Sequence, residues 1–176
     1  MDVSLIETLI DEHGKDIYNF CRKLTYSEFD AEELYQDTFL KAMDAAERID
    51  VNNNPKSYLL SIAVSLWNNK KRKYARRNRI APTDSLDDEN NYSVAADRNT
   101  PEEELLQKEL YKTVNQCINE LDEKMRVPII LYYHSGLSVE KISEIIKCPQ
   151  GTVKSRLHKA RTLLRERLEV YGIEGF

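Results

Sequence analysis

The sequence predicts an all-α protein of two small helical domains joined by a flexible acidic linker, with a helix-turn-helix in the C-terminal domain. Apolar residues recur at helical spacing along most of the 176-residue chain. This periodicity stops over residues 80–100, where the chain is polar, acidic and poor in apolar residues. A short and a longer amphipathic segment, separated by a tight turn, follow near the C-terminus. The predicted domains are therefore residues 1–79 and 101–176.

The N-terminal domain is predicted to contain three helical segments. Residues 5–24 carry apolar positions at helical spacing and form a first helix or a pair of helices. The next segment begins after Asp30, the expected N-cap, with Glu33 completing a capping box. Asn54 is expected to cap the third segment, and Pro55 occupies its first turn, where a proline is well tolerated.

The C-terminal domain is expected to begin with a helix capped by Thr100 and followed by Pro101. A second helix is predicted from about Asp122 to His134. Pro128 lies deep within this second helix, where a proline removes a backbone hydrogen bond and its ring clashes with the preceding turn. We therefore expect a kink or an early break at Pro128.

The helix-turn-helix is predicted over residues 137–168. Ser138 can cap a short helix, residues 148–151 (Cys-Pro-Gln-Gly) end it, and Thr152 begins a longer helix. One face of the longer helix is apolar and the opposite face is basic, as in a recognition helix that enters the major groove of DNA. An ordinary amphipathic helical hairpin is the structural alternative.

The distribution of charge is more informative than the formal net charge of −4. Residues 70–79 are densely basic, and residues 154–167 carry six basic side chains against one acidic one. Phosphate binding depends on local charge rather than on the total. Two basic segments separated by an acidic one indicate two separate contacts with nucleic acid, although either segment alone is equally typical of a solvated face.

Other features argue against a secreted, membrane-spanning or catalytic protein. The three cysteines (Cys21, Cys117 and Cys148) are far apart in the sequence, which favours a reducing, cytoplasmic setting. No signal peptide and no apolar stretch of about 18 residues is evident. The three histidines lack metal-ligand spacing, and there is neither a phosphate-binding glycine loop nor a nucleophile elbow. A metal-dependent hydrolase or nuclease is thus a weak alternative, and no metal, cofactor or small-molecule substrate is expected.

Three segments resemble one protein family, in the order that the family has them. The strongest match is LSVEKISEIIKCPQGTVKSRLHKARTLLRERL, above all GTVKSRLHKAR, which is similar to the promoter-reading region of extracytoplasmic-function (ECF) sigma factors of bacterial RNA polymerase, in the sigma-70 family. Upstream, DAEELYQDTFLKAM resembles their polymerase-binding helix, and NPKSYLLSIAVSLWNNKKRKYARR resembles their promoter-melting helix. The resemblance implies sigma region 2 in residues 1–79, sigma region 4 in residues 101–176 and a linker between them.

The resemblance implies a contact with the clamp of the largest polymerase subunit through Glu33, Gln36 and Asp37. Their spacing places them on one face of a helix. The capping box explains Glu33 equally well, so its role stays ambiguous. The family usually has aspartate at the position of Glu33 and glutamate at that of Asp37.

The second implied site recognises the minus-ten element. In the family, a flipped base enters a pocket formed by a loop and an asparagine on the following helix; Ser65 stands at that asparagine position here, which leaves the preferred base open. Trp67 either stacks on DNA or is buried beside Ala63, and the lysines and arginines after it would bind phosphate. The implied residues are Ile49, Asn52, Asn53, Asn54, Ser65, Trp67, Lys70, Lys71, Arg72, Lys73, Arg76 and Arg77.

The third implied site recognises the minus-thirty-five element. Arg156 is the best candidate base reader, because arginine can form a bidentate contact with guanine. His158 either faces DNA or is merely solvated. The implied residues are Thr152, Lys154, Ser155, Arg156, His158, Lys159 and Arg161.

The implied partners are core RNA polymerase (the clamp of its largest subunit and the flap of the second), promoter DNA, and an anti-sigma factor, which in the family is often membrane-anchored. Two other binding functions remain open. A stand-alone helix-turn-helix repressor or response regulator would bind its promoter without polymerase, and an anti-sigma or adaptor protein would inhibit transcription.

Overall fold

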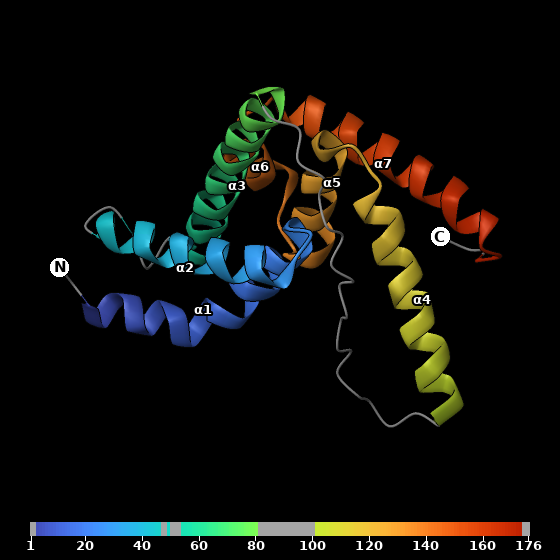
Figure 1. The fold of residues 1–176 in the computed structure, drawn as a ribbon, viewed down its shortest axis with the longest axis horizontal. Helices are drawn as coiled ribbons and strands as arrows, with labels where there is room; N and C mark the ends of the chain where they lie inside the picture. The colour runs from blue at the N-terminus through green and yellow to red at the C-terminus, as the bar shows by residue number, and fades with distance from the viewer. Residues whose placement is uncertain (1–2, 47–48, 50–53, 81–100, 174–176) are drawn as a thin grey trace.

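The structure, a computed structural model, describes residues 3–46, 49, 54–80 and 101–173, and these form helices joined by short turns (Figure 1). The predicted all-α fold class is confirmed. Asn52, Asn53 and the predicted linker, apart from Ile80, lie outside the described residues. In chain order the elements are α1 (Val3–Leu24), α2 (Glu28–Asp44), α3 (Pro55–Ile80), α4 (Pro101–Asn119), α5 (Glu123–Ile129), the π-helix η2 (Ile130–His134), α6 (Val139–Ile146) and α7 (Gln150–Val170).

The three N-terminal helices pack against one another around a buried apolar centre. The first predicted segment is one helix, α1, rather than a pair. The predicted N-cap of α2 is wrong, because α2 begins at Glu28 and is capped by Ser27. The Ser27 Oγ accepts a hydrogen bond from the Asp30 backbone N–H over 3.1 Å and donates one to the Asp30 carboxylate over 2.8 Å. Asp30 thus lies in the first turn, and Glu33 lies beyond the capping interaction.

The start of α3 agrees with the sequence prediction. Asn54 takes a left-handed backbone conformation with φ of 53°, and its side-chain oxygen accepts a hydrogen bond from the Ser57 backbone N–H over 3.1 Å. Pro55 is the first helical residue. An asparagine cap and a first-turn proline therefore fix the beginning of the longest described helix.

The chain continues through Pro128, and its hydrogen-bonding pattern changes just beyond that residue. The Asp122 carboxylate caps α5 by accepting from the Lys124 backbone N–H over 2.8 Å. Pro128 lies inside α5, and the wider π-helix η2 starts two residues later, at Ile130. Since proline cannot donate to the preceding turn, a local widening of the helix is one way to accommodate it. The disturbance predicted at Pro128 therefore appears as a change from α to π bonding.

The helix-turn-helix consists of α6 and α7. Ser138 caps α6 as predicted, its Oγ accepting from the Lys141 backbone N–H over 3.2 Å. The predicted start of the second helix at Thr152 is wrong, because α7 begins at Gln150. Lys147, with φ of 53°, makes the left-handed turn, so Gly151 is free to lie inside the first turn of α7.

Ser138→Ala is expected to lower the free energy of unfolding by about 1 kcal/mol, because it removes the side-chain acceptor of the α6 cap. Urea denaturation followed by far-UV circular dichroism measures this change. Ser155→Ala is the control: Ser155 is exposed on α7 and caps no helix, so we expect a change within about 0.5 kcal/mol. Equal losses in the two variants would contradict the capping role.

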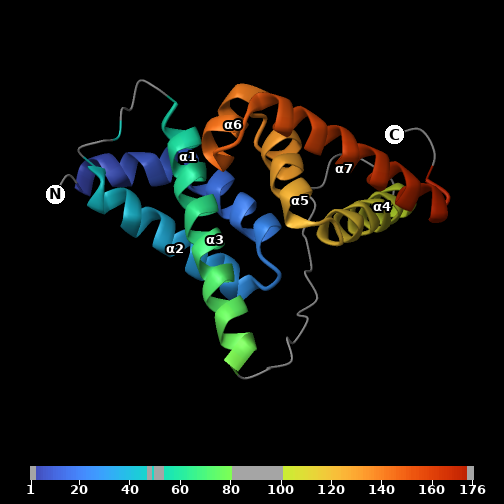
Figure 2. The ribbon, with the colours of Figure 1, turned by 90° about the horizontal axis from the view of Figure 1, so that it is seen from above.

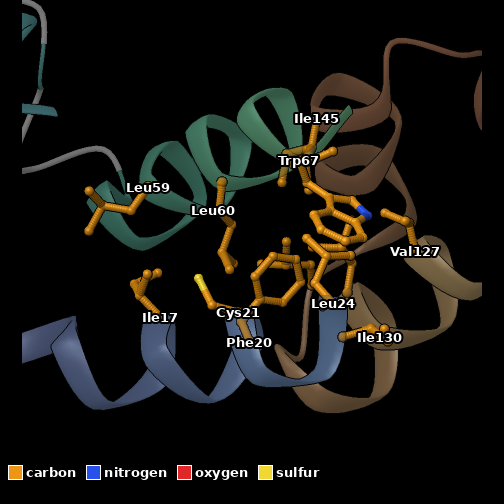
Figure 3. Packing of buried hydrophobic residues seen from close by; sticks show 14 of the residues in the cluster. Ile17, Phe20, Cys21, Leu24, Leu59, Leu60, Trp67, Val127, Ile130 and Ile145 are labelled. Carbon is orange, nitrogen blue, oxygen red and sulfur yellow. The ribbon is translucent and has the colours of Figure 1, made fainter. Parts of the chain in front are cut away.

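The N-terminal and C-terminal helices share one continuous core, which the sequence did not indicate. The ribbon view shows α6 beside α3 (Figure 2). Helix α3 contacts α6, and α1 contacts η2. The close view shows Leu24 and Trp67 packed beside Val127, Ile130 and Ile145 from the C-terminal helices (Figure 3).

In the part of the chain that the structure describes, no helix is both long and apolar enough to cross a membrane.

Candidate nucleic-acid interface

The exposed face of α7 carries most of the residues predicted to read the minus-thirty-five element. The opposite, apolar face is anchored in the core by Val153, Leu157 and Ala160, which pack with α5 and α6. Burial of every third or fourth residue turns the intervening positions outward. Lys154, Ser155, His158, Lys159 and Arg161 are exposed, whereas Thr152 and Arg156 are half-buried.

Arg156 lies against the turn of the helix-turn-helix. Its Nη1 approaches the Cys148 Sγ at 3.9 Å. A thiol is a weak hydrogen-bond acceptor, so this contact orients the guanidinium without competing strongly with a base. The Arg156 guanidinium therefore has a defined position before DNA is bound, at the end of α7 nearest the turn.

The basic segment of α3 divides into an exposed part and an engaged part. Arg72, Lys73, Arg76 and Arg77 are exposed and, with Asn69, line a shallow surface hollow. Such a cluster of cations on one helix can bind successive phosphates.

Lys70 belongs to the engaged part of α3 and connects this helix to α2. Its Nζ lies 2.5 Å from a carboxylate oxygen of Asp30 and 2.5 Å from one of Glu33. Burial opposes protonation of Lys70, but the hydrogen bonds to Asp30 and Glu33 outweigh it and raise the pKa of this amine. Glu33, ambiguous from the sequence, therefore pairs with a residue predicted to bind DNA.

One hollow between α2 and α3 is lined by residues of both kinds: acidic residues predicted to bind polymerase and basic residues predicted to bind DNA. The hollow has a volume of about 320 Å³. Gln36 and Asp37 are exposed on α2, and Asp37 reaches the rim of the hollow. Its lining includes Glu33, Asp37, Lys70, Lys73, Tyr74 and Arg77.

Two other predicted minus-ten residues face the C-terminal helices. Trp67 is 4% exposed, and its indole Nε1–H donates to the Glu123 carboxylate over 2.5 Å. Lys71 pairs with the same carboxylate. Burial, and then the positive charge of Arg126, lower the pKa of Lys71. Trp67 is therefore buried, which is the second of the two roles predicted for it. In addition to the apolar core, it contacts Glu123 and Tyr26.

The remaining predicted residues near the minus-ten site are placed separately. Ile49 is buried, Asn54 caps α3, and Ser65 is exposed on α3. The structure also places Glu123 against Trp67 and Lys71 of the predicted minus-ten site, with the buried Arg126 beside it, and neither residue was predicted from the sequence. An arginine within the apolar run around Val127 was the available signal for a buried charge.

Metal ligands and cysteine thiols are two kinds of reactive group that can be examined in the described residues. Among them, no group of three or more histidine, cysteine or acidic side chains is arranged to hold a metal ion. Burial raises the pKa of the Cys21 thiol to about 12, and burial also raises that of Cys117. Both thiols are therefore protonated at neutral pH and are poor nucleophiles.

Comparison with known proteins identifies the family. The sequence model of Sigma-70 region 2 matches residues 9–77, and that of Sigma-70, region 4 matches residues 111–164. The ECF RNA polymerase sigma factor SigW of Bacillus subtilis is 32% identical over 172 residues, which cover 95% of this chain and 90% of SigW. The chain belongs to the ECF sigma factors. The ECF sigma-E factor of Haemophilus influenzae is 33% identical over 145 residues, covering 80% of this chain and 75% of that protein.

Two solved structures have the same fold. The sigma factor RpoE of Bartonella quintana, in complex with the anti-sigma factor NepR, matches with a TM-score of 0.77 and 25% identity, over 93% of this chain and 96% of that one. CnrH, in complex with the cytosolic domain of CnrY, matches in fold with a TM-score of 0.62 and 22% identity, over 94% and 88% of the two chains. In this sigma factor, the exposed cations of α3 lie in the segment matched by region 2, and those of α7 from Lys154 to Arg161 lie in the segment matched by region 4.

Proposed function

We propose that this ECF sigma factor binds core RNA polymerase and directs it to specific promoters, with region 2 at the minus-ten element and region 4 at the minus-thirty-five element. The observation that carries the proposal is the presence of two separate basic surfaces, one in each family region. They are formed by Arg72, Lys73, Arg76 and Arg77 on α3 and by Lys154, Lys159 and Arg161 on α7. It acts as a binding factor and not as an enzyme; polymerase supplies the chemistry.

Region 2 would dock on the clamp of the largest polymerase subunit through Gln36 and Asp37, which α2 holds exposed. The neighbouring cations of α3 would hold the phosphates of the melted strand. Ser65 lies exposed on the same helix, where a hydroxyl can donate to or accept from a flipped base. Asn52 and Asn53, in the loop before α3, remain predicted contributors to that pocket.

Region 4 would place α7 in the major groove and contact the flap of the second-largest subunit. Arg156 would read guanine, while Lys154 and Lys159 would neutralise phosphates. Ser155, Thr152 and Arg161 lie close enough along the helix to add contacts to bases or phosphates, and His158 would lie beside them.

Control by an anti-sigma factor is part of the same proposal. RpoE of Bartonella quintana was solved in complex with the anti-sigma factor NepR, and CnrH was solved in complex with the cytosolic domain of CnrY. For this chain we expect a regulator of the anti-sigma class, which would hold the sigma factor at the membrane if it is itself membrane-anchored. The sigma factor would act in the bacterial cytoplasm, where polymerase and promoter DNA are found.

Transcription reconstituted in vitro tests the proposal. Core polymerase with this protein and fragmented DNA of the source bacterium should produce transcripts that start at a small set of sites sharing two sequence elements. Core polymerase alone should not use these sites. If the purified protein bound the same sites without polymerase and repressed transcription from them, the helix-turn-helix repressor would replace the sigma-factor function.

The double substitution Gln36→Ala with Asp37→Ala is expected to weaken binding to core polymerase about 10-fold or more, because truncating a hot-spot residue of an interface costs about 2 kcal/mol or more. Fluorescence anisotropy of the labelled protein with core polymerase measures the affinity. Asp44→Ala, which removes an exposed charge from the same helix, is the control and should leave the affinity unchanged. An unchanged affinity in the double variant would remove these two residues from the docking site.

A further inference from the structure

Lys70 on α3 is held by two carboxylates of α2. Its Nζ lies 2.5 Å from Oδ1 of Asp30 and 2.5 Å from Oε2 of Glu33. The Lys70 side chain is 19% exposed, whereas the cations of α3 from Arg72 to Arg77 are exposed. Lys70 therefore faces α2, while the cations on the following turns face the solvent.

Asp30 is oriented by the cap of α2 before it meets Lys70. The Ser27 Oγ accepts from the Asp30 backbone N–H over 3.1 Å and donates to Asp30 Oδ2 over 2.8 Å, so Oδ1 is left for Lys70. Asp30 also lies in the first turn of α2, where the backbone amides attract negative charge. The lysine thus meets a carboxylate whose position α2 has already fixed.

The Lys70 contact lies between the two surfaces proposed for region 2. On α2, Glu33 is one helical turn before Asp37, which faces the docking side. On α3, Lys70 is one turn before Lys73 and two turns before Arg77, and all five side chains line the same hollow. The C-terminal end of α3 continues past α1 and α2 (Figures 1 and 2). A contact at the base of this projecting end fixes where its cations lie.

The charges at this contact make Lys70 a poor phosphate ligand. Two carboxylates outweigh one ammonium, so Asp30, Glu33 and Lys70 together present no positive potential to DNA. Reaching a phosphate would also take Lys70 away from both acids and leave two partly buried carboxylates unpaired beside a polyanion. An isolated surface ion pair contributes little to stability, but this pair is partly buried, shared by two acids and oriented by a helix cap.

We infer that Lys70 is a positioning residue and not a phosphate contact: with Asp30 and Glu33 it forms a brace that fixes α3 against α2 and sets where the cations of α3 lie relative to the polymerase-docking face. The inference rests on the proposed function for the roles of the two surfaces. The brace itself lies within region 2 and belongs to the isolated chain.

Unfolding of the isolated chain in urea tests the brace without polymerase or DNA. Lys70→Glu, which brings three carboxylates together, should raise the unfolding equilibrium constant about 5- to 30-fold. Adding Glu33→Lys should recover most of this loss, because two carboxylates and one amine then meet again. Lys73→Glu is the matched control: it makes the same charge change at an exposed lysine one turn along α3, and should change the constant less than about 2-fold.

Should Lys70→Glu fail to fold, the neutral variants Lys70→Gln and Glu33→Gln take its place. Because the two side chains interact, the double variant should lose less stability than the two single losses combined. The exposed pair of Lys41 and Asp44, 3.7 Å apart on α2, is the control, and the losses from its two neutral variants should nearly add. Additive losses at Lys70 and Glu33 as well would contradict the brace.

The salt dependence of DNA binding separates a positioning residue from a phosphate contact. For holoenzyme on a single-stranded minus-ten oligonucleotide, each phosphate contact contributes about 0.7 to the slope of log affinity against log salt concentration. Lys73→Gln should reduce the slope by about this amount, whereas Lys70→Gln should leave it unchanged. Equal reductions by the two variants would return Lys70 to the DNA surface and overturn the inference.

Promoter opening measures the positioning itself. With 2-aminopurine in the minus-ten element and a saturating amount of sigma factor, Lys70→Glu should slow opening about 10-fold or more, because the cations of α3 are displaced. Adding Glu33→Lys should restore opening although position 70 then carries a carboxylate, which a phosphate contact would not tolerate. The assay is run at a temperature at which far-UV circular dichroism shows each variant folded.

The inference is overturned if Lys70→Glu destabilises the chain no more than Lys73→Glu, or if adding Glu33→Lys recovers no stability. Unchanged promoter opening by the folded Lys70→Glu holoenzyme overturns it as well. The urea measurements contain neither polymerase nor DNA, so they are independent of the proposed function. A brace confirmed in urea, together with no polymerase binding by the unmodified protein, would refute the proposed function alone.

Discussion

Phe20→Ala is expected to lower the free energy of unfolding by about 3–5 kcal/mol, one of the two largest effects expected in this protein. Phe20 is 0% exposed, and its ring fills the centre of the N-terminal core, between α1 and α3 (Figure 3). Truncation removes a large apolar surface from the core and leaves a cavity that the surrounding helices can only partly close. Urea denaturation followed by circular dichroism measures the loss.

Phe29→Ala is the matched control for Phe20→Ala. The Phe29 ring is 75% exposed on the first turn of α2, so the same chemical change there should alter stability by less than about 0.5 kcal/mol. A loss at position 29 as large as that at position 20 would show that the buried and exposed faces have been assigned incorrectly.

Arg156→Ala is expected to lower discrimination for the minus-thirty-five element by about 1–3 kcal/mol, or about 5- to 150-fold, because a bidentate contact with a base is lost. Initiation rates measured on a promoter and on variants of its upstream element give this discrimination directly. The substitution should reduce the rate on the original promoter and make the variants nearly equivalent. Helix α7 should stay folded, since Arg156 is only half-buried.

Lys159→Ala provides the contrast to Arg156→Ala. Lys159 is exposed on the same helix, and as a phosphate contact it should weaken all promoters about equally and reduce the salt dependence of binding by about one counterion. If Arg156→Ala behaved in this uniform way instead, Arg156 would be a phosphate contact and another residue of α7 would read the sequence.

Local signals made most of the fold predictable. The apolar periodicity gave the helices, and Asn54 and Ser138 cap two of them as expected because a cap depends on a few adjacent residues. The start of α2 was missed because Ser27 and Asp30 are both good caps, and one additional turn forms when the earlier one is used. The turn before α7 was misplaced because Lys147, rather than glycine, takes the left-handed conformation.

The candidate site was less predictable, because its residues interact over long sequence separations. Exposure of Lys154 and Lys159 follows from the helical period alone. The pairing of Lys70 with Asp30 and Glu33 depends on how α2 packs against α3, and the pairing of Trp67 with Glu123 depends on how region 4 packs against region 2. Neither packing arrangement leaves a periodic signal in the sequence.

The hollow between α2 and α3 constrains how this protein can evolve. Its walls combine Glu33 and Asp37, on the side that would meet polymerase, with Lys73 and Arg77, on the side that would meet DNA. Because these side chains line one hollow, a substitution on the side proposed to meet polymerase would also change the electrostatic potential on the side proposed to meet DNA. We therefore expect related sequences that prefer a different core polymerase also to prefer different promoters. Charge changes on α2 should then be accompanied by compensating changes on α3.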